Sequence, residues 1–467
     1  MNLFALSPVQ GVVVLSLYWA ATIAVTRVLT RPETKEQFLA AGRTLGVWES
    51  AFSIAATWIW APALFVAAQK AYTQGVAGVF WFTVPNVLCL IVFAPFANII
   101  REKVPEGYTL SAYMRERFST RVQGLYVLEM TGLAVCSFAV QLLAGGKVLA
   151  YLSGLSFFWI TVVMAAIALS YSLLGGLKSS VVTDYLQMFI ILVVGGGSLA
   201  WALGRAGGWE TVFAGLGGVS GKFANVFSGD GLSVALSFGL PVTVGLMAGP
   251  FGDQSFWQRA FATKREKVQG AFVRGALIFG LVPLMMACLG FVAAGKGWKV
   301  TDPALVNLEV VARLLPTWTV VPFVVMLLSG LISTLDSNLC AISSLTGHDF
   351  LERVASGPRA RPSWTSLYVS RVGMILLALV GVAVANIPDM KILYLFLFYG
   401  TLRASTLLPT VISLLKTRVS EAGLFYGITA SILIGLPIFA YGNFNRMTTW
   451  TVVGSLVTVL TSGLVTL

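Results

Sequence analysis

The sequence predicts an all-α polytopic membrane protein with a single transmembrane domain over residues 1–467. Its composition is 57% hydrophobic and 11% charged, with a mean hydropathy of +0.85, whereas soluble domains carry about 25% charged residues. The apolar residues form runs of about 20, the length of a transmembrane helix, without the alternation of barrel strands. Two runs are interrupted, and they lie five spans apart. Because five is odd, the halves that they begin have opposite orientations, as in an inverted repeat.

The first apolar run, 9–29, is an extra helix before the repeats. No basic segment precedes it, so we expect no cleaved signal peptide. The run at 47–72 contains Pro62 and two tryptophans, which predicts a broken helix. It opens a first repeat, 47–203, whose other runs are 78–100, 122–152, 157–174 and 180–203.

The second repeat is predicted at 232–415. Its first run, 232–251, is interrupted by Pro241 and by the cluster at 248–254. Its other runs are 271–295, 316–346, 367–385 and 392–415, with a short outer helix at 303–315. Two C-terminal helices follow within 422–467, at 422–441 and 448–467. The sum is about thirteen spans, with one helix before the repeats and two after.

The net charge of +12 reports topology rather than a nucleic-acid partner. If the N-terminus lies outside, roughly two thirds of the Lys and Arg residues fall on the inner side, which is the positive-inside pattern. We therefore expect a multi-pass protein of the cell membrane with its C-terminus inside. The predicted inner loops carry Arg31, Lys35, Arg43, Arg101, Lys103, Arg115, Arg117, Arg121, Arg259, Lys264, Arg265, Lys267, Arg353, Arg359, Arg361, Lys416 and Arg418.

The stretch from Ser329 to Asp349 places small oxygen-bearing side chains on one helix face. At 100° per residue they fall within a stripe of roughly 120°. Such a face suits a hard cation, although a small-residue packing face would look similar. Packing alone does not require the carboxylate of Asp336. The stripe contains Ser329, Gly330, Ser333, Asp336, Ser337, Cys340 and Ser344.

Other polar residues in the apolar runs have two readings each. Asp184 either faces an ion or reaches the inner interface. Asp253 and Gln254 either end a helix or line the solute pathway. Trp58 and Trp60 either gate solute or pack, and Gln141 either bonds a neighbouring helix or contacts solute. We predict a solute site from Trp58, Trp60, Gln141, Asp253 and Gln254.

Four stretches resemble the sodium:solute symporter family: FLAAGRTLG at 38–46, GGLKSSVVTDYLQ at 175–187, DQSFWQRAFA at 253–262 and GLISTLDSNLCAISS at 330–344. The resemblance implies a leucine-transporter-like fold with five-plus-five inverted repeats. It also implies a first sodium site from the backbone carbonyls of Ala56, Ile59 and Gly330 and the hydroxyls of Ser333 and Thr334. A second sodium site would combine Asp184, Asp336 and Ser337 with Ser333.

The solute is less constrained by the sequence. The passage at 56–81, together with DQSFWQR, resembles the urea-transporter branch of the family, and Arg403 is the one obvious mid-membrane partner for an anion. The hypothesis is a sodium-coupled symporter that carries a small polar solute (urea, an amino acid, a carboxylate or a sugar) inward by alternating access. Alternatives are proton coupling through Asp184, Asp336 or His348, and a sensor without net transport. No set of nucleophile and base indicates an enzyme.

Overall fold

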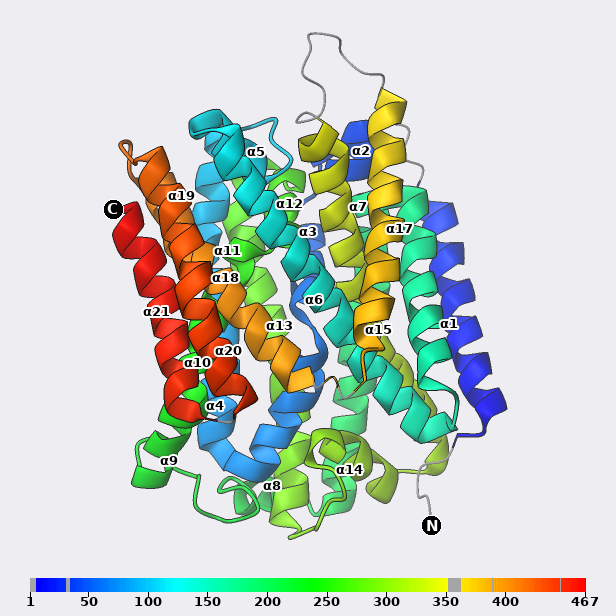
Figure 1. Ribbon diagram of the computed structural model, residues 1–467. Helices are drawn as coiled ribbons and strands as arrows, with labels where there is room; N and C mark the ends of the chain where they lie inside the picture. Colours follow the sequence, from blue (N-terminus) through cyan, green and yellow to red (C-terminus); the bar gives the residue numbers. More distant parts are fainter. Residues whose placement is uncertain (1–5, 31–33, 352–362, 389, 391, 446) are drawn as a thin grey trace.

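The computed structural model describes residues 6–30, 34–351, 363–388, 390, 392–445 and 447–467. Among these residues the regular elements are helices, gathered into one bundle (Figure 1). Ten of the described helices are long and apolar enough to cross a membrane. An all-helical, multi-pass protein is therefore confirmed. The count of thirteen spans, the repeat symmetry and the orientation of the termini stay predictions.

The described part of the N-terminal half contains eight α-helices. They are α1 (Pro8–Leu29), α2 (Lys35–Ala40), α3 (Val47–Trp58), α4 (Ala61–Lys103), α5 (Leu110–Arg117), α6 (Thr120–Ser153), α7 (Phe157–Ala206) and α8 (Trp209–Ala214), with a 3-10 turn, η1, at Ala41–Arg43.

The described part of the C-terminal half contains twelve α-helices. They are α9 (Gly229–Val234), α10 (Leu240–Met247), α11 (Gly249–Gly252), α12 (Gln254–Ala262), α13 (Val268–Gly295), α14 (Val306–Leu314), α15 (Val320–Ser344), α17 (Ser363–Ala385), α18 (Ile392–Leu415), α19 (Glu421–Ala430), α20 (Leu436–Phe444) and α21 (Thr448–Thr466). Shorter turns are η2 (Ala235–Gly239), η3 (Arg265–Lys267), η4 (Pro303–Leu305), η5 (Thr317–Thr319), η6 (Leu345–Phe350) and η7 (Ser431–Gly435).

The predicted break in the run at 47–72 lies between α3 and α4. Helix α3 ends at Trp58, and Ile59 and Trp60 have non-helical backbone, with ψ angles of 83° and 174°. Helix α4 then begins at Ala61 with Pro62 in its first turn, where the missing N–H has no helical acceptor to lose. The break leaves backbone carbonyls of α3 free to take other partners.

Two pairs of predicted runs are joined without a loop. Gly75 bends α4 and Gly176 bends α7, each with a φ of 54°. A side chain at these positions would be strained and would also overlap a neighbouring carbonyl oxygen, that of Leu216 or of Phe38. In Figure 1, α4 turns back at the lower edge of the bundle. The runs at 61–72 and 78–100 are therefore the two arms of one bent helix.

The second interrupted run breaks at one of its two predicted positions, within the cluster at 248–254, and not at Pro241. Pro241 does not interrupt its run, because the π-helical turn η2 precedes it and the Leu240 N–H reaches back to the Ala235 carbonyl. The helical geometry stops instead at Asp253, whose φ and ψ are −100° and 112°. The Asp253 side chain then caps α12 by accepting from the Ser255 N–H at 2.9 Å.

Helix α15 lies inside the bundle, packed against α7, α6, α17 and α3. Its residues from Met326 to Ser344 are all buried, so both its aliphatic face and its hydroxyl face contact protein. By contrast, α1 and α21 at the two sides of the bundle in Figure 1 expose many large aliphatic side chains. The predicted polar stripe is therefore held among neighbouring helices.

Candidate functional site

Five oxygens converge where the break between α3 and α4 meets α15. The Ser333 hydroxyl lies 2.8 Å from the Ala56 carbonyl oxygen and 3.3 Å from that of Gly330. The Thr334 hydroxyl lies 3.1 Å from the Ile59 carbonyl oxygen and 3.3 Å from that of Gly330. These are the five groups of the predicted first sodium site, and we call them the oxygen cluster.

The oxygen cluster has more acceptors than donors. The Thr334 hydroxyl faces three carbonyl oxygens, those of Ile59, Gly330 and Thr57, the last at 3.4 Å. One hydroxyl has a single proton and can satisfy one of them at a time. A small cation placed among these oxygens would satisfy all of them, because hard cations prefer neutral and anionic oxygen ligands. The donor set therefore fits sodium.

The second set of predicted ligands surrounds an arginine. The Arg259 side chain is completely buried, and its Nη2 atom lies 3.3 Å from Asp184 Oδ2 and 2.8 Å from the Ser337 hydroxyl. Its Nε–H donates to the Ser53 hydroxyl at 2.9 Å, and Ser53 in turn donates to Asp184 at 2.5 Å. Arg259 was expected in a basic inner loop; it lies instead in α12, with its guanidinium inside the bundle.

Asp336 completes this second group, which we call the arginine cluster. Asp336 Oδ1 accepts from the Ser180 hydroxyl at 2.7 Å, and Oδ2 accepts from Tyr171 and, at 3.3 Å, from Thr183. Ser180 also lies 3.3 Å from Arg259 Nη2. The guanidinium thus pairs directly with Asp184, and the Ser180 hydroxyl lies between it and Asp336. Hydroxyl donors surround both buried carboxylates, which lowers the cost of burying their charge.

A small hollow adjoins the oxygen cluster. Trp58, Trp60 and Asp253 line it, as predicted for the solute site, and Thr334 of the oxygen cluster forms part of its wall. The Trp58 and Trp60 rings stack with centroids 5.9 Å apart. Sequence reasoning missed further lining residues, namely Ser137, Ser255, Asn338 and Tyr399. They lie on separate helices, so no spacing pattern in the sequence predicts that they share one hollow.

Two predicted solute residues have structural partners instead. Gln141 Oε1 accepts from the Ala61 N–H at 2.8 Å and so caps the start of α4. Gln254 bonds the Leu110 N–H at 3.3 Å, the Tyr108 carbonyl at 2.9 Å and the Ser344 hydroxyl at 3.1 Å. Neither lines the hollow. In this structure the two amides satisfy backbone and hydroxyl groups.

The two ends of the bundle are closed to different degrees. On the side of α14, a cavity of about 280 Å³ reaches from Ala61 and Pro62 to Asp302. At the opposite end, near α2 and α5, side chains fill the path: Asp349 accepts from Ser111 and, at 2.8 Å, from Thr109. His348 lies at this filled end, with Nδ1 3.4 Å from Lys35 Nζ. Among the described residues, the larger cavity therefore lies on the α14 side.

The sequence is similar to a known protein family and to several known transporters. The model of the sodium:solute symporter family matches residues 38–431. The chain is 24% identical to the urea-proton symporter DUR3 of Oryza sativa subsp. japonica, over 92% of this chain and 66% of that protein. It is 25% identical to the sodium/pantothenate symporter of Haemophilus influenzae, over 93% and 90% of the two chains.

A solved structure resembles the whole bundle. A Na⁺-coupled sialic acid symporter in a substrate-bound, outward-open state aligns with a TM-score of 0.79 over 97% of this chain and 96% of its own, at 14% identity. Mhp1, a nucleobase-cation-symport-1 family transporter, aligns with a TM-score of 0.59 over 92% and 93% of the two chains, at 16% identity. At such identities the likeness concerns the fold alone.

Proposed function

Because this chain belongs to the sodium:solute symporter family, we propose that it couples inward sodium movement to the uptake of a small polar solute of the urea class. Transporters in this family are secondary carriers, and the matched relatives are transporters rather than enzymes. The observation that carries the proposal is the oxygen cluster, in which the Ser333 and Thr334 hydroxyls meet three backbone carbonyls at the helix break.

The proposed coupling passes through Thr334. Its hydroxyl belongs to the oxygen cluster and also lines the hollow for solute. Sodium there holds the α3–α4 break against α15 and so completes one wall of the hollow. Binding energy shared in this way is reciprocal: sodium raises the affinity for solute, and solute raises the affinity for sodium by the same factor.

The proposed direction follows the predicted topology. With the N-terminus outside, the α14 end faces the exterior, and the open cavity on that side admits solute. Release requires the filled end near α2 and α5 to open while the α14 side closes, which is alternating access. One charge crossing about 100 mV supplies roughly 2.3 kcal/mol, so a single sodium supports roughly 50-fold accumulation from voltage alone.

We propose that Arg259 takes the place of a second coupling cation in this state. Its guanidinium lies between Asp184 and Ser337, two of the residues predicted to bind a second sodium. Sodium at Asp184, Asp336 and Ser337 would require Arg259 to move away. This favours one sodium per solute.

Proton-coupled uptake is the second candidate. Several matched relatives are urea transporters, and one is named a urea-proton symporter. In this chain the arginine cluster has two carboxylates and one guanidinium, so one carboxylate charge has no counter-charge within the cluster. A proton entering with solute would neutralise that charge.

Uptake of radiolabelled urea into proteoliposomes separates the candidates. The voltage is clamped with potassium and valinomycin, and an inward gradient of either sodium or protons is imposed. We expect the sodium gradient to drive concentrative uptake and the proton gradient to leave it unchanged. Uptake that ignores sodium and follows the proton gradient would replace the first candidate by the second.

A further inference from the structure

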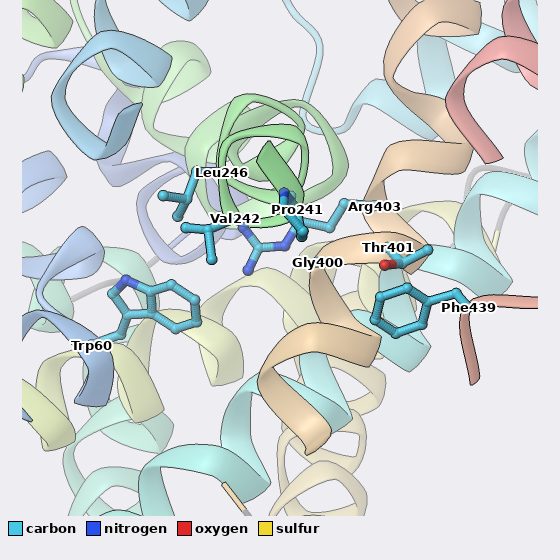
Figure 2. A pocket seen from close by; sticks show the side chains of 9 residues that line it. Trp60, Pro241, Val242, Leu246, Gly400, Thr401, Arg403 and Phe439 are labelled. Atoms are coloured by element: carbon cyan, nitrogen blue, oxygen red, sulfur yellow. The ribbon is translucent and has the colours of Figure 1, made fainter. Parts of the chain in front are cut away.

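Arg403 on α18 places a charged side chain in a second hollow behind Trp60. The residue is 1% exposed. Figure 2 shows its guanidinium directed between Trp60 and the helix that carries Val242 and Leu246. The hollow lies between α10, α18, α20 and Trp60, which stands at the break before α4. A guanidinium in such a place needs an acceptor, because burying an unpaired charge is costly.

No acceptor meets two of the guanidinium nitrogens. Among the described residues, Nε and Nη1 of Arg403 have no hydrogen-bond partner, and no ion pair joins Arg403 to a carboxylate. Leaving a buried charged donor unsatisfied costs more than a single hydrogen bond gains. The two N–H groups are therefore available to a ligand.

Aromatic rings hold the guanidinium without using its N–H groups. The Arg403 Cζ atom lies 3.4 Å from the centre of the Tyr399 ring, 5.4 Å from that of Trp60 and 5.7 Å from that of Trp58. Cation–π contact acts through the ring faces and so leaves the donors in the guanidinium plane unengaged. The charged group is fixed in orientation, as a binding group must be.

A glycine keeps the space for this group. A Cβ atom at Gly249 would lie 2.6 Å from Arg403 Nη1 and would overlap the Trp58 ring. Gly249 begins α11, just before the break at Asp253. The close approach of α11 to Arg403 and Trp58 thus depends on the absence of a side chain there.

The charges nearby indicate what kind of acceptor fits. Glu129 accepts from Thr406 at 2.9 Å through Oε1, while its Oε2 has no partner among the described residues. Asp253 accepts from the Tyr399 hydroxyl at 3.3 Å. Both carboxylates contribute to the electrostatic environment of Arg403. The Asp253 carboxylate near Arg403 already offsets the guanidinium charge, so an anionic ligand would leave surplus negative charge and an uncharged carbonyl is the favoured acceptor.

We propose that Arg403 donates an unpartnered guanidinium N–H, from Nε or from Nη1, to the carbonyl oxygen of an uncharged, planar amide solute, with urea as the simplest case. The proposal rests on the proposed function, because Trp60 lines both this hollow and the one beside the oxygen cluster, where its ring contacts that of Tyr399. The site therefore requires a solute with a carbonyl acceptor and disfavours a solute with a carboxylate.

Equilibrium binding of radiolabelled urea to the purified protein in sodium tests the proposal. We expect Arg403→Gln to weaken urea binding about 10- to 100-fold, the loss that accompanies removal of a charged hydrogen-bond donor. Arg403→Lys keeps the charge without the planar fork, and we expect binding at least about 10-fold weaker than wild type. The matched control Arg274→Gln removes an exposed arginine and should leave binding unchanged.

Competition identifies the acceptor. Unlabelled acetamide should displace urea, whereas acetate and guanidinium at the same concentration should not. The proposal is overturned if Arg403→Gln and Arg403→Lys both bind urea as wild type does, if acetate competes better than acetamide, or if the wild-type protein binds neither urea nor acetamide. The sodium-induced rise in Tm is followed for every variant. It shows that a variant is folded, and its absence in the wild type would count against sodium coupling and not against Arg403.

Discussion

Two clusters of oxygens lie on neighbouring turns of α15, and only one of them contains a cationic side chain. The oxygen cluster contains neutral carbonyls and hydroxyls, with no cationic side chain among its hydrogen-bond partners in the described chain. The arginine cluster has two carboxylates and contains its own cation, Arg259. Ligand type alone therefore does not define an ion site. In the arginine cluster the guanidinium already balances carboxylate charge, whereas in the oxygen cluster the acceptors outnumber the hydroxyl protons and can bind a cation.

The two clusters are joined by Ser337. Its hydroxyl accepts from Arg259 at 2.8 Å and lies 3.0 Å from the Thr57 hydroxyl at the end of α3. It also donates to the Ser333 carbonyl at 2.7 Å. A change in the hydrogen bonds of either cluster therefore alters the contacts of Ser337 with the other cluster.

The largest expected effect comes from removing both hydroxyls of the oxygen cluster. In Ser333→Ala combined with Thr334→Ala, three carbonyls remain, and too few ligands are left for a monovalent ion. We expect sodium-dependent urea uptake in proteoliposomes to fall at least about 100-fold, which corresponds to about 2.7 kcal/mol of lost ion binding. The control is Ser329→Ala, a buried hydroxyl on the same helix that bonds its own backbone. Sodium dependence that survives in the double variant would remove the oxygen cluster from the account.

The next largest effect is expected from removing Arg259, the cation of the arginine cluster. Arg259→Gln leaves Asp184 and Asp336 buried without a counter-charge, which should lower the free energy of unfolding by about 3–5 kcal/mol. Adding Asp184→Asn removes one of the uncompensated charges and should recover a large part of that loss. Thermal unfolding of the single and double variants measures both effects. A single variant as stable as wild type would mean that Arg259 does not neutralise the carboxylates.

The sequence could predict the oxygen cluster because its features are local. The stripe on α15 and the break before Pro62 are visible in the residue order, and the resemblance supplied Ala56 and Ile59 as partners. Arg259 could not be placed in this way. In sequence it stands a few residues before Lys264, Arg265 and Lys267 and looks like one more loop charge. A hint was available, since Phe256, Trp257 and Phe261 surround it and would be unusual in a solvated loop.

The lining of the hollow beside the oxygen cluster was only partly predictable for a related reason. Trp58, Trp60 and Asp253 flank backbone breaks, and breaks can be read from proline and glycine. Asn338 and Tyr399 face the hollow only because α15 and α18 pack beside the first break. Gln141 and Gln254 were assigned to solute because a lone amide among apolar residues indicates a polar partner. It does not indicate whether that partner is a ligand or a backbone group.

A smaller effect is expected where a neutral donor supports the arginine cluster. Tyr171→Phe removes the hydroxyl that donates to Asp336 and leaves the charge balance with Arg259 intact. A hydrogen bond to a charged group contributes about 1.5–3 kcal/mol, so unfolding free energy should fall by that amount. Sodium affinity should change much less than in the Ser333 and Thr334 variant. If Tyr171→Phe instead abolishes sodium dependence, the two clusters are one site.

The smallest effect concerns the contact between the clusters. Thr57→Val removes the hydroxyl 3.0 Å from Ser337 but keeps the shape of the side chain and the Thr57 carbonyl. We expect a loss of about 0.5–1.5 kcal/mol in stability. The half-saturating sodium concentration for urea uptake should shift about two- to fivefold. A shift as large as that of the double hydroxyl variant would place Thr57 among the ion ligands.

The central claim is that sodium binds the oxygen cluster and not the arginine cluster. Equilibrium binding of radioactive sodium to the purified protein tests it most directly, with wild type compared with Ser333→Ala combined with Thr334→Ala, and with Asp184→Asn. We predict one sodium per chain in the wild type, none in the double variant and one in Asp184→Asn. Two sodium ions per wild-type chain, or binding that survives in the double variant and disappears in Asp184→Asn, would contradict the account.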